Sequence, residues 1–352
     1  MAKFNRGDVS EGILAAAITA RFLSKTRRIS SVDVINVVRN LKRATGSGTK
    51  GKTSKTEFPS ANENPDVIDI VCCKVNLAEV NMDAFEDLSL YSTKDFKDIV
   101  NASVKYANGT YIMQFADLMY SNNQKNYIEV LAEGLLDQTG TKVDLKVKVD
   151  GKQVGVGVSL KFGTVKQFGQ VGGSSFDSME ALFSSLGVKF NSTFRKKYSE
   201  MISNREIGPG LTMAYNEAVR QMNRKNQKVL VKSIAEFMKY HATLNEEDVA
   251  LVQLNKSEAG VYDFGRLASK LQGQEVELEV VEGTTGKLSG YKGGNKIPKI
   301  NFILKSTGDI LLSIRLKLEG NRTNSKGKRL PLVVRNYIEK GKATTTVLME
   351  TA

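Results

Sequence analysis

Residues 142–161, KVDLKVKVDGKQVGVGVSLK, alternate apolar and polar side chains on both sides of the pair Asp150-Gly151. A period of two is typical of β-strands, and Asp-Gly favours a two-residue type I′ turn. The segment therefore predicts a β-hairpin in which Val149 pairs with Lys152. A slip of one residue would turn every side chain to the opposite face, so this pattern constrains the local fold strongly.

One face of this hairpin is expected to be polar and to have no bulk at its centre, because side chains on one face repeat every second residue. The register sets Asp144 opposite Gly157. The residues expected on this face are Asp144, Lys146, Lys148, Gly155, Gly157, Ser159 and Lys161. A carboxylate beside a lysine, over glycines that admit a ligand, is what metal-assisted attack on a phosphate requires. The solvated, lysine-rich face of an ordinary hairpin is the alternative.

The order of elements in residues 95–172 resembles the catalytic core of the PD-(D/E)XK nuclease superfamily. A helix and a strand precede the strand with Asp144, and the next strand ends in Ser159-Leu160-Lys161. The resemblance implies a restriction-endonuclease-like fold and a DNA phosphodiester as substrate. It also implies that Asp144 binds Mg²⁺ or Mn²⁺, and that Lys161 orients the attacking water or stabilises charge on the phosphate.

The motif departs from the family at Ser159, where most members have a glutamate; it is similar to a minority of restriction endonucleases that carry Ser-X-Lys. A serine hydroxyl is a poorer Mg²⁺ ligand than a carboxylate. We therefore expect the carbonyl of Leu160 and another acidic residue to complete the metal site. The candidates are Glu133, which is preferred because it would share the polar face, and Glu129, Asp117 and Asp137. Gln167 resembles the glutamine that follows the lysine in several branches, and would orient the surrounding shell together with Ser159.

The formal net charge of +13 is concentrated at the two ends of the chain. Lys and Arg exceed Asp and Glu by 8 in residues 1–57 and by 9 in residues 291–352, so the middle is slightly acidic. Such an excess favours a polyanion through counterion release, and we expect DNA as the partner. Basic tails of ribosomal and structural proteins are the alternative explanation. A homodimer is left open.

The residues present exclude several kinds of site. His241 is the only histidine, which excludes His-metal-finger nucleases, Ser-His-Asp catalysis and His-paired zinc sites. Residues 46–53, GSGTKGKT, match the pattern GxxxxGK[ST], but they lie in a segment predicted as a flexible linker with no helix after it, so we expect no nucleotide cofactor. Cys72 and Cys73 are neighbours, and neighbours on a strand point to opposite faces, so they predict neither a disulfide nor a metal site.

The composition, 41% hydrophobic and 25% charged, is normal for a globular protein. No apolar run is long enough to cross a bilayer, and no signal peptide is visible at the start. We therefore expect no membrane partner and a cytoplasmic location in a bacterial cell, with a phage-encoded origin left open.

Along the chain, helical spacing predicts helices over residues 10–25 and 30–43, and Ser30 with Asp33 predicts a capping box. This pair could read the major groove or simply pack on a domain. Further helices are expected over 93–107, 109–121 and 246–255. The predicted division is a helical pair at 1–43, a flexible linker at 44–65, a nuclease-like core at 66–172, a helical region at 173–272 and a basic β-rich region at 273–352.

The C-terminal region predicts strands over residues 275–282, 299–305 and 309–319, the last two paired with each other. Their polar faces and the following loop are rich in Lys and Arg. The residues expected to contact DNA, there and near the hairpin, are Lys146, Lys166, Arg315, Lys317, Arg322, Lys328, Arg329 and Arg335.

Taken together, the sequence predicts an α+β protein with a restriction-endonuclease-like central mixed sheet flanked by helices, a helical insertion and a basic C-terminal β-rich part. The expected function is that of a metal-dependent DNA endonuclease. Two alternatives stay open: a non-catalytic DNA-binding protein on a nuclease scaffold, and a structural or assembly protein of a virus.

Overall fold

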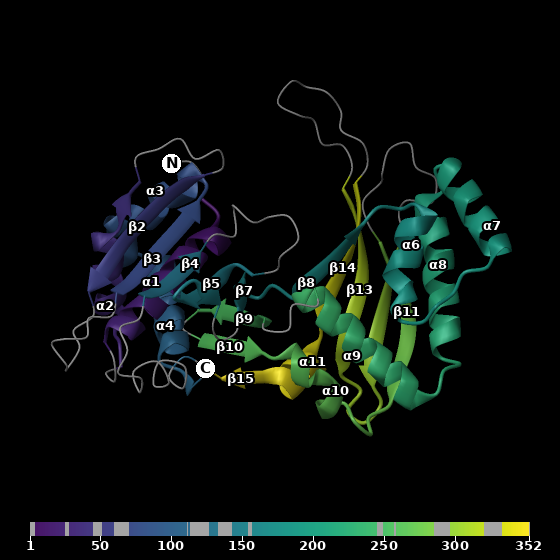
Figure 1. Cartoon of the computed structure of the whole chain (residues 1–352). Helices are drawn as coiled ribbons and strands as arrows, with labels where there is room; N and C mark the ends of the chain where they lie inside the picture. Colours follow the sequence, from purple (N-terminus) through teal and green to yellow (C-terminus); the bar gives the residue numbers. More distant parts are fainter. Residues whose placement is uncertain are drawn as a thin grey trace. The chain divides into compact units, whose positions relative to one another are not determined.

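The computed structural model divides into two compact units, each with its own sheet (Figure 1). Unit 1 comprises Met1–Val165, Thr243–Asp263 and Met349–Ala352, and unit 2 comprises Lys166–Ala242 and Phe264–Leu348. The chain therefore passes between the units four times. The structure describes residues 4–24, 28–44, 51–59, 70–110, 112, 127–132, 143–153, 157–244, 249–256, 258–284, 296–319 and 333–351.

These units differ from the five consecutive segments predicted from the sequence. Residues 1–43 and 44–65 belong to the same unit as most of 66–172, while 173–272 and 273–352 each contribute to both units. The reason is long-range strand pairing, since two strands that follow the long helical region return to the sheet of unit 1. Such pairing leaves no mark in local composition.

Unit 1 contains a mixed sheet of ten strands in the described part of the chain, in the order β1-β2-β3-β4-β5-β7-β9-β10-β15, with β6 paired to β5. The pairs β3/β4 and β7/β9 are parallel. The strands are β1 (Lys42–Arg43), β2 (Lys52–Pro59), β3 (Ile70–Leu77), β4 (Tyr127–Ala132), β5 (Leu145–Val149), β6 (Lys152–Gln153), β7 (Gly157–Phe162), β9 (Val249–Asn255), β10 (Glu258–Tyr262) and β15 (Met349–Thr351). The expected class, a large mixed sheet flanked by helices in an α+β protein, is confirmed.

The hairpin turn is also confirmed. Val149 pairs with Lys152, and the two residues between them, Asp150 and Gly151, have φ angles of 48° and 80°. Two consecutive residues with positive φ are the signature of a type I′ turn, and Asp-Gly adopts it at low cost.

Farther from the turn the register differs from the expectation. Leu145 pairs with Val158, whereas a continuous two-residue hairpin would pair it with residue 156. A change of two residues keeps every side chain on its expected face. Its effect is to bring Asp144 level with Ser159 instead of Gly157.

Helix α1 (Arg6–Leu23) packs directly on this sheet. Its first turn is capped by Asn5, whose side chain accepts a hydrogen bond from the backbone N of Gly7 (2.9 Å). A Cβ atom added at Gly12 would lie 3.0 Å from the ring of Phe85 and 3.1 Å from Cγ1 of Val75. The helix therefore approaches β3 and α3 (Glu79–Glu86) as closely as only a glycine permits.

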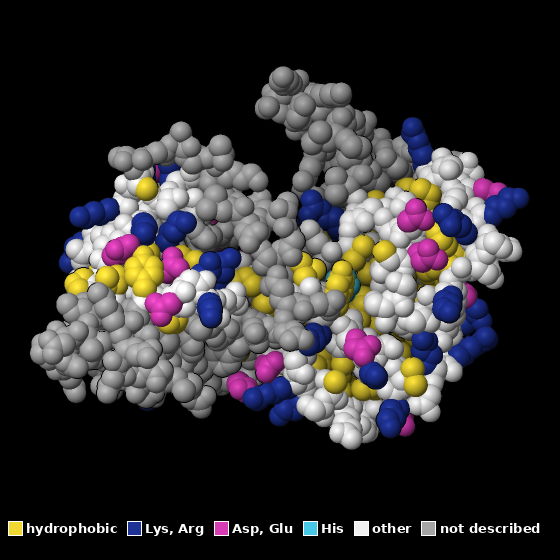
Figure 2. All heavy atoms as spheres, viewed as in Figure 1, with side chains coloured by type: hydrophobic (Ala, Val, Ile, Leu, Met, Phe, Trp, Pro, Cys, Tyr) yellow, Lys and Arg dark blue, Asp and Glu magenta, His cyan; other side chains and the backbone are white. Residues whose placement is uncertain are grey.

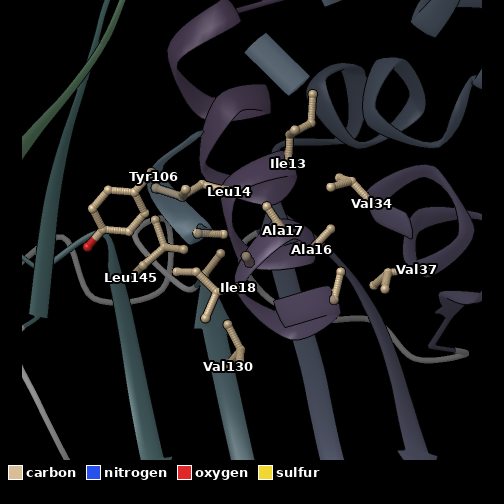
Figure 3. Packing of buried hydrophobic residues seen from close by; sticks show 14 of the residues in the cluster. Ile13, Leu14, Ala16, Ala17, Ile18, Val34, Val37, Tyr106, Val130 and Leu145 are labelled. Atoms are coloured by element: carbon tan, nitrogen blue, oxygen red, sulfur yellow. The ribbon is translucent and has the colours of Figure 1, made fainter. Parts of the chain in front are cut away.

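Small and aliphatic side chains fill both faces of α1. Ala15, Ala16 and Ala17 are fully buried, so the helix contacts β3, β4 and β7 on one side and other helices on the other. Figure 3 shows Ile18 directed toward the sheet residues and Ala16 directed toward α2. Packing thus fixes the position of α1 over the sheet. It thereby also fixes where the backbone of the polar residues of this helix lies.

The remaining helices of unit 1 are α2 (Ser31–Asn40), η1 (Leu88–Ser92) and α4 (Lys94–Ala107). The predicted capping box at the start of α2 is confirmed, because the carboxylate of Asp33 accepts bonds from the backbone N (2.8 Å) and hydroxyl (2.7 Å) of Ser30. Both α2 and α4 contact α1. The helical pair at the N-terminus therefore packs as part of the unit 1 core.

Unit 2 contains an antiparallel five-stranded sheet, again within the described residues, in the order β11-β12-β13-β14-β8. The predicted pairing of β12 with β13 is confirmed. The strands are β8 (Gln167–Gly172), β11 (Val276–Thr284), β12 (Lys296–Leu304), β13 (Ile310–Glu319) and β14 (Val333–Lys340).

The helices of unit 2 are α6 (Phe176–Ser184), α7 (Ser192–Ser203), α8 (Ile207–Met222), α9 (Gln227–Thr243), η2 (Phe264–Arg266), α10 (Leu267–Lys270) and α11 (Lys342–Leu348). Helix α8 packs on β11 and β12, and Figure 1 shows α6 and α8 alongside the sheet. The hydroxyl of Tyr215 in α8 donates to Oδ1 of Asn336 in β14 (2.6 Å). One face of the sheet is therefore covered by helices.

Two local predictions are wrong. Residues 44–65, predicted as a flexible linker, contain β2, because a polar segment such as Lys52–Pro59 can still form a strand when it pairs with β3. Residues 246–255, predicted as a helix, contain β9. A continuous apolar run is ambiguous between a buried parallel strand and a helix. Most of the predicted helix 109–121 lies outside the described residues.

The two cysteines follow the prediction. Cys72 and Cys73 are both free and buried, and Cys73 belongs to the apolar core under α1 while Cys72 lies on the opposite face of β3. Among the helices that the structure describes, none combines the length and the apolar character that a transmembrane segment needs.

Candidate active site

Asp144 lies immediately before β5, at the point where the chain enters the sheet. Its backbone N donates to the carbonyl O of Val158 (2.8 Å), and its carboxylate Oδ2 accepts a bond from the backbone N of Leu160 (2.6 Å). The carboxylate thus occupies the place of a strand partner along β7. Hydrogen bonding from a backbone N–H fixes the orientation of the carboxylate.

The same bond defines where the carbonyl of Leu160 points. In a β-strand the N–H and C=O of one residue lie on the same side, because a hydrogen-bonded pair exchanges both bonds. The Leu160 carbonyl therefore points toward the β5 side of β7, the side from which Asp144 approaches. Ser159, between Val158 and Leu160, is 2% exposed. Asp144 is consequently bonded to the residues on both sides of Ser159, Val158 and Leu160.

Lys161 is the last of the hairpin residues expected at the site. It lies on β7 in register with Gln253 of β9, and it is half-buried. Residues 159 and 161 point to the same face of β7, away from the apolar face formed by Val158 and Leu160. The expectation that Asp144, Ser159 and Lys161 share one region of the sheet agrees with this geometry.

A second carboxylate, which the sequence analysis missed, comes from α1. Glu11 is half-buried and lies within electrostatic reach of Asp144 and Lys161. Burial, followed by the charges of Asp144 and Asp8, raises the pKa of Glu11 well above its ordinary value, and the Lys161 ammonium opposes this rise. Glu11 is therefore within electrostatic reach of both Asp144 and Lys161, although 150 positions separate it from Lys161.

Asp8, one turn before Glu11, is held by two asparagines. Its Oδ1 accepts from Nδ2 of Asn5 (2.8 Å) and its Oδ2 from Nδ2 of Asn81 in α3 (2.6 Å). Burial raises the pKa of Asp8, and the bond from Asn5 works in the opposite direction. Asp8 thus ties the start of α1 to α3 and adds negative charge beside Glu11.

The pair Asp8 and Glu11 is the one signal in the sequence that could have identified this residue. The two acids lie three positions apart, on one face of a helix whose other residues are almost all apolar. Which strand residues this face meets depends on the packing of α1 over β7, and the sequence does not give that.

Glu129, one of the other predicted ligands, is not brought to Asp144. Glu129 lies on β4 opposite Lys148 and Cys72, and Lys148 is four residues along β5 from Asp144, about 13 Å at the rise of a strand. Glu133, Asp117 and Asp137 lie outside the described residues.

Gln167 belongs to β8 of the sheet in unit 2, and its side-chain amide donates to Oε1 of Gln170 (3.2 Å). It is therefore not among the residues that unit 1 gathers around Asp144. The chain leaves unit 1 after Val165, only four residues beyond Lys161, and nothing in the local sequence marks that crossing. The role of Gln167 in orienting the site stays a prediction.

The residues expected to contact DNA divide between the two units. Lys146 is half-buried on β5, on the same face as Lys148. Lys166, Arg315, Lys317 and Arg335 belong to unit 2. The other three, Arg322, Lys328 and Arg329, lie outside the described residues. Figure 2 shows Lys and Arg side chains interspersed with Asp and Glu over the visible surface.

The donor set can be tested against a divalent metal. Within the described part of the chain, no group of three or more His, Cys, Asp or Glu side chains is arranged to bind a metal. Mg²⁺, however, is commonly held by one or two carboxylates with several waters retained. Asp144, Glu11 and the Leu160 carbonyl supply hard oxygen donors of that kind. The raised pKa of Glu11 reports two like charges in a poorly solvated place, which a cation would neutralise.

The arrangement therefore combines two carboxylates, those of Asp144 and Glu11, with one ammonium group, that of Lys161. Its carboxylates attract a cation, and the ammonium of Lys161 attracts an anion such as a phosphate oxygen. No model of a known protein family matches the chain, and no curated protein or solved structure matches it.

Proposed function

We propose that unit 1 is a restriction-endonuclease-like nuclease core that hydrolyses DNA phosphodiester bonds with a divalent metal. The observation that carries the proposal is the grouping of Glu11, Asp144 and Lys161 where β5 begins beside β7. A core that only needed stability would gain nothing from two neighbouring carboxylates, because their repulsion and desolvation disfavour the folded state. Such arrangements of perturbed groups are concentrated at functional sites.

Asp144, Glu11 and the carbonyl of Leu160 would hold Mg²⁺ or Mn²⁺. When bound, the metal supplies Lewis-acid chemistry, polarising a phosphoryl oxygen and favouring a hydroxide-like nucleophile at neutral pH. The residues of the chain fix where this happens. Asp144 is oriented by the N–H of Leu160 at 2.6 Å, and Glu11 is carried by a helix that close packing holds over the sheet.

Lys161 would place its ammonium against the phosphate or the attacking water, and would neutralise part of the negative charge that develops during hydrolysis. Ser159, buried between the two residues that Asp144 bonds, would keep this part of β7 in place. Glu11 would take the position of the second acid that Ser159 does not supply, so the motif and the helix together would make up a complete set of ligands.

The experiment is a cleavage assay on supercoiled, linear and single-stranded DNA with Mg²⁺, with Mn²⁺ and with EDTA. The variants Asp144→Asn, Glu11→Gln and Lys161→Met remove one charge each with little change in volume. We expect each to lose metal-dependent cleavage, and we expect EDTA to stop cleavage by the unaltered protein.

Two matched controls lie on the same sheet. Glu129 and Lys148 are half-buried cross-strand partners on β4 and β5. Glu129→Gln and Lys148→Met make the same chemical changes away from the site, and we expect them to cleave normally. Normal cleavage by the three site variants, with circular dichroism showing that they are folded, would contradict the proposal.

A second candidate is a DNA-binding protein that retains this scaffold without catalysis. The serine at position 159 favours it, because most members of the superfamily that the motif resembles have a carboxylate there. It predicts binding of DNA with no turnover in Mg²⁺ or Mn²⁺, and unchanged binding in Asp144→Asn. The cleavage assay with a parallel binding assay separates the two functions.

A further inference from the structure

The sheet of unit 2 carries a cluster of cations around one tyrosine. Arg315 on β13 pairs across the sheet with Tyr337 on β14, and the next pair on the same face is Lys317 with Arg335. Lys299 on β12 pairs with Arg315 from the other side. We name these five residues the Tyr337 face.

The Tyr337 face is the side of the sheet opposite to the packed helices. Alternate residues of the same strands, such as Ile314, Leu316 and Ile338, are fully buried in the core, and Asn336 bonds to Tyr215 of α8. Because side chains alternate along a strand, Tyr337 and Arg315 must point the other way. All five members of the Tyr337 face are half-buried, so their outer atoms reach solvent.

Two cations hold the ring of Tyr337. Cζ of Arg315 and Nζ of Lys317 each lie 5.3 Å from the ring centroid. Arg315 is itself oriented by Glu339, whose Oε1 accepts from Nε (3.1 Å) and Nη2 (2.7 Å). Cation–π contact and the ion pair therefore keep an aromatic ring at a defined place in the middle of a positive surface.

The β8 side of the ring is bordered by small or uncharged residues. Gln170 pairs with Tyr337, and Gly172 pairs with Arg335. A Cβ added at Gly172 would meet no described atom within 4 Å. Among the described residues, there is thus open space over Gly172, at the pair next to Tyr337 on this face.

We propose that the Tyr337 face binds single-stranded DNA, with one base stacked on Tyr337 and neighbouring phosphates contacted by Lys299, Lys317 and Arg335. A base can stack on a side chain only when it is unpaired, and aromatic rings set among cations are the usual platform for single strands. A duplex keeps the faces of its bases stacked on one another, so it offers this ring no base to stack on and only its phosphates could be contacted. The inference rests on the proposed function only in taking DNA as the polymer.

The test is fluorescence anisotropy with a labelled oligonucleotide of about 15 nucleotides, within the usual site sizes, as a single strand and as a duplex. Both are measured in EDTA with the full-length Asp144→Asn protein, so that cleavage plays no part. We expect the single strand to bind more tightly than the duplex. Tyr337→Ala should weaken single-strand binding by about 5- to 150-fold, and Tyr337→Phe should retain most of it.

Further variants separate stacking from charge and from folding. Tyr337→Leu keeps apolar bulk and should bind as weakly as the alanine variant. Arg335→Ala should reduce the dependence of log Kd on log salt concentration by about 0.7. Tyr240 on α9 is 42% exposed, so Tyr240→Ala serves as the control and should bind normally. Thermal unfolding of each variant establishes that it is folded.

Equal affinity for single strand and duplex, or normal binding by folded Tyr337→Ala and Tyr337→Leu, would overturn the inference. The two proposals fail separately. Absence of metal-dependent cleavage by the unaltered protein, with intact single-strand binding, would remove the nuclease, whereas cleavage without a role for Tyr337 would remove this binding surface.

Discussion

The two sheets of the molecule treat charge in opposite ways. In unit 1, burial and then the neighbouring charge of Asp144 raise the pKa of Glu11 well above its ordinary value. In unit 2, Glu339 on the polar face is bonded to its cationic neighbour Arg315, and Glu279 on the same face accepts a bond from the side-chain amide of Asn301. In the first arrangement, a bound cation would relieve the repulsion between the carboxylates, as expected of a catalytic site. The second spreads positive charge over continuous strands, which suits binding.

The largest effect is expected from substitutions at the candidate site of unit 1. Asp144→Asn and Lys161→Met should each lower the rate of Mg²⁺-dependent DNA cleavage by about a hundredfold or more, as is usual when a group that stabilises transition-state charge is removed. The same variants should bind single-stranded DNA with unchanged affinity, because the Tyr337 face lies on the other sheet. Parallel cleavage and anisotropy measurements check both statements. An equal loss of binding and cleavage would contradict the assignment of cleavage to unit 1 and of single-strand binding to unit 2.

Glu11→Gln should separate activity from stability. The pKa of Glu11 is raised in the folded state, so the stability linked to its protonation is present below its ordinary pKa and is lost as pH rises through the folded value. Glutamine stays neutral at every pH. The variant should therefore unfold at the same temperature as the unaltered protein at about pH 4 and at a higher temperature at about pH 8.

Calorimetry at the two pH values, without metal, makes the measurement. The unaltered protein should gain more thermal stability from added Mg²⁺ than Glu11→Gln does, because a metal stabilises only a state that binds it. A variant that is less stable at alkaline pH would mean that Glu11 has a structural partner and no unfavourable charge to relieve.

Gly12→Ala tests whether the position of α1 matters. The new methyl group would meet the ring of Phe85 at 3.0 Å and Val75 at 3.1 Å, and both neighbours are fully buried. Overpacking of about 1–3 kcal/mol should exceed the gain of up to about 1 kcal/mol in helix propensity. We expect a lower free energy of unfolding in urea and slower cleavage, since Glu11 moves with the helix. Gly172→Ala, which meets no described atom within 4 Å, should leave cleavage unchanged.

The smallest effect is expected from removing the acid that pairs with Arg315 in unit 2. Glu339→Gln removes the acid that holds Arg315, and should strengthen binding of single-stranded DNA by about two- to fivefold, the usual range for a partly exposed ion pair. Anisotropy at low salt measures it, and the gain should shrink as salt is raised. Weaker binding would mean that Glu339 serves the surface by orienting Arg315.

Local features of the fold could be predicted from the sequence to the residue. The Asp150-Gly151 turn, the capping box of Ser30 and the pairing of β12 with β13 each depend on short-range chemistry, either the positive φ of a turn or the alternation of a strand. Fold class followed from the same patterns. Asp144 and Lys161 could be proposed from the sequence because one hairpin carries both.

What could not be predicted depends on contacts between distant segments. Glu11 belongs to a helix whose packing partner on β7 is about 150 positions away, and the apolar stripe of α1 says only that it is buried. Gln167 follows Lys161 closely in sequence but joins another sheet. β9 was mistaken for a helix because a strand buried in parallel pairing has no alternation to reveal it. In each case the missing information is topology.

The four crossings of the chain between its units carry a consequence for how the protein can be made and can evolve. Strand β9, the parallel neighbour of β7, is encoded after the whole of residues 166–242, and the last strand of the same sheet is encoded at the very end. A fragment that stops at residue 165 exposes the hydrogen-bonding edge beside Lys161 and lacks its partner. Neither unit can therefore be expressed as one contiguous segment. Recombination that exchanges one unit must preserve both points at which the chain re-enters unit 1, Thr243 and Met349.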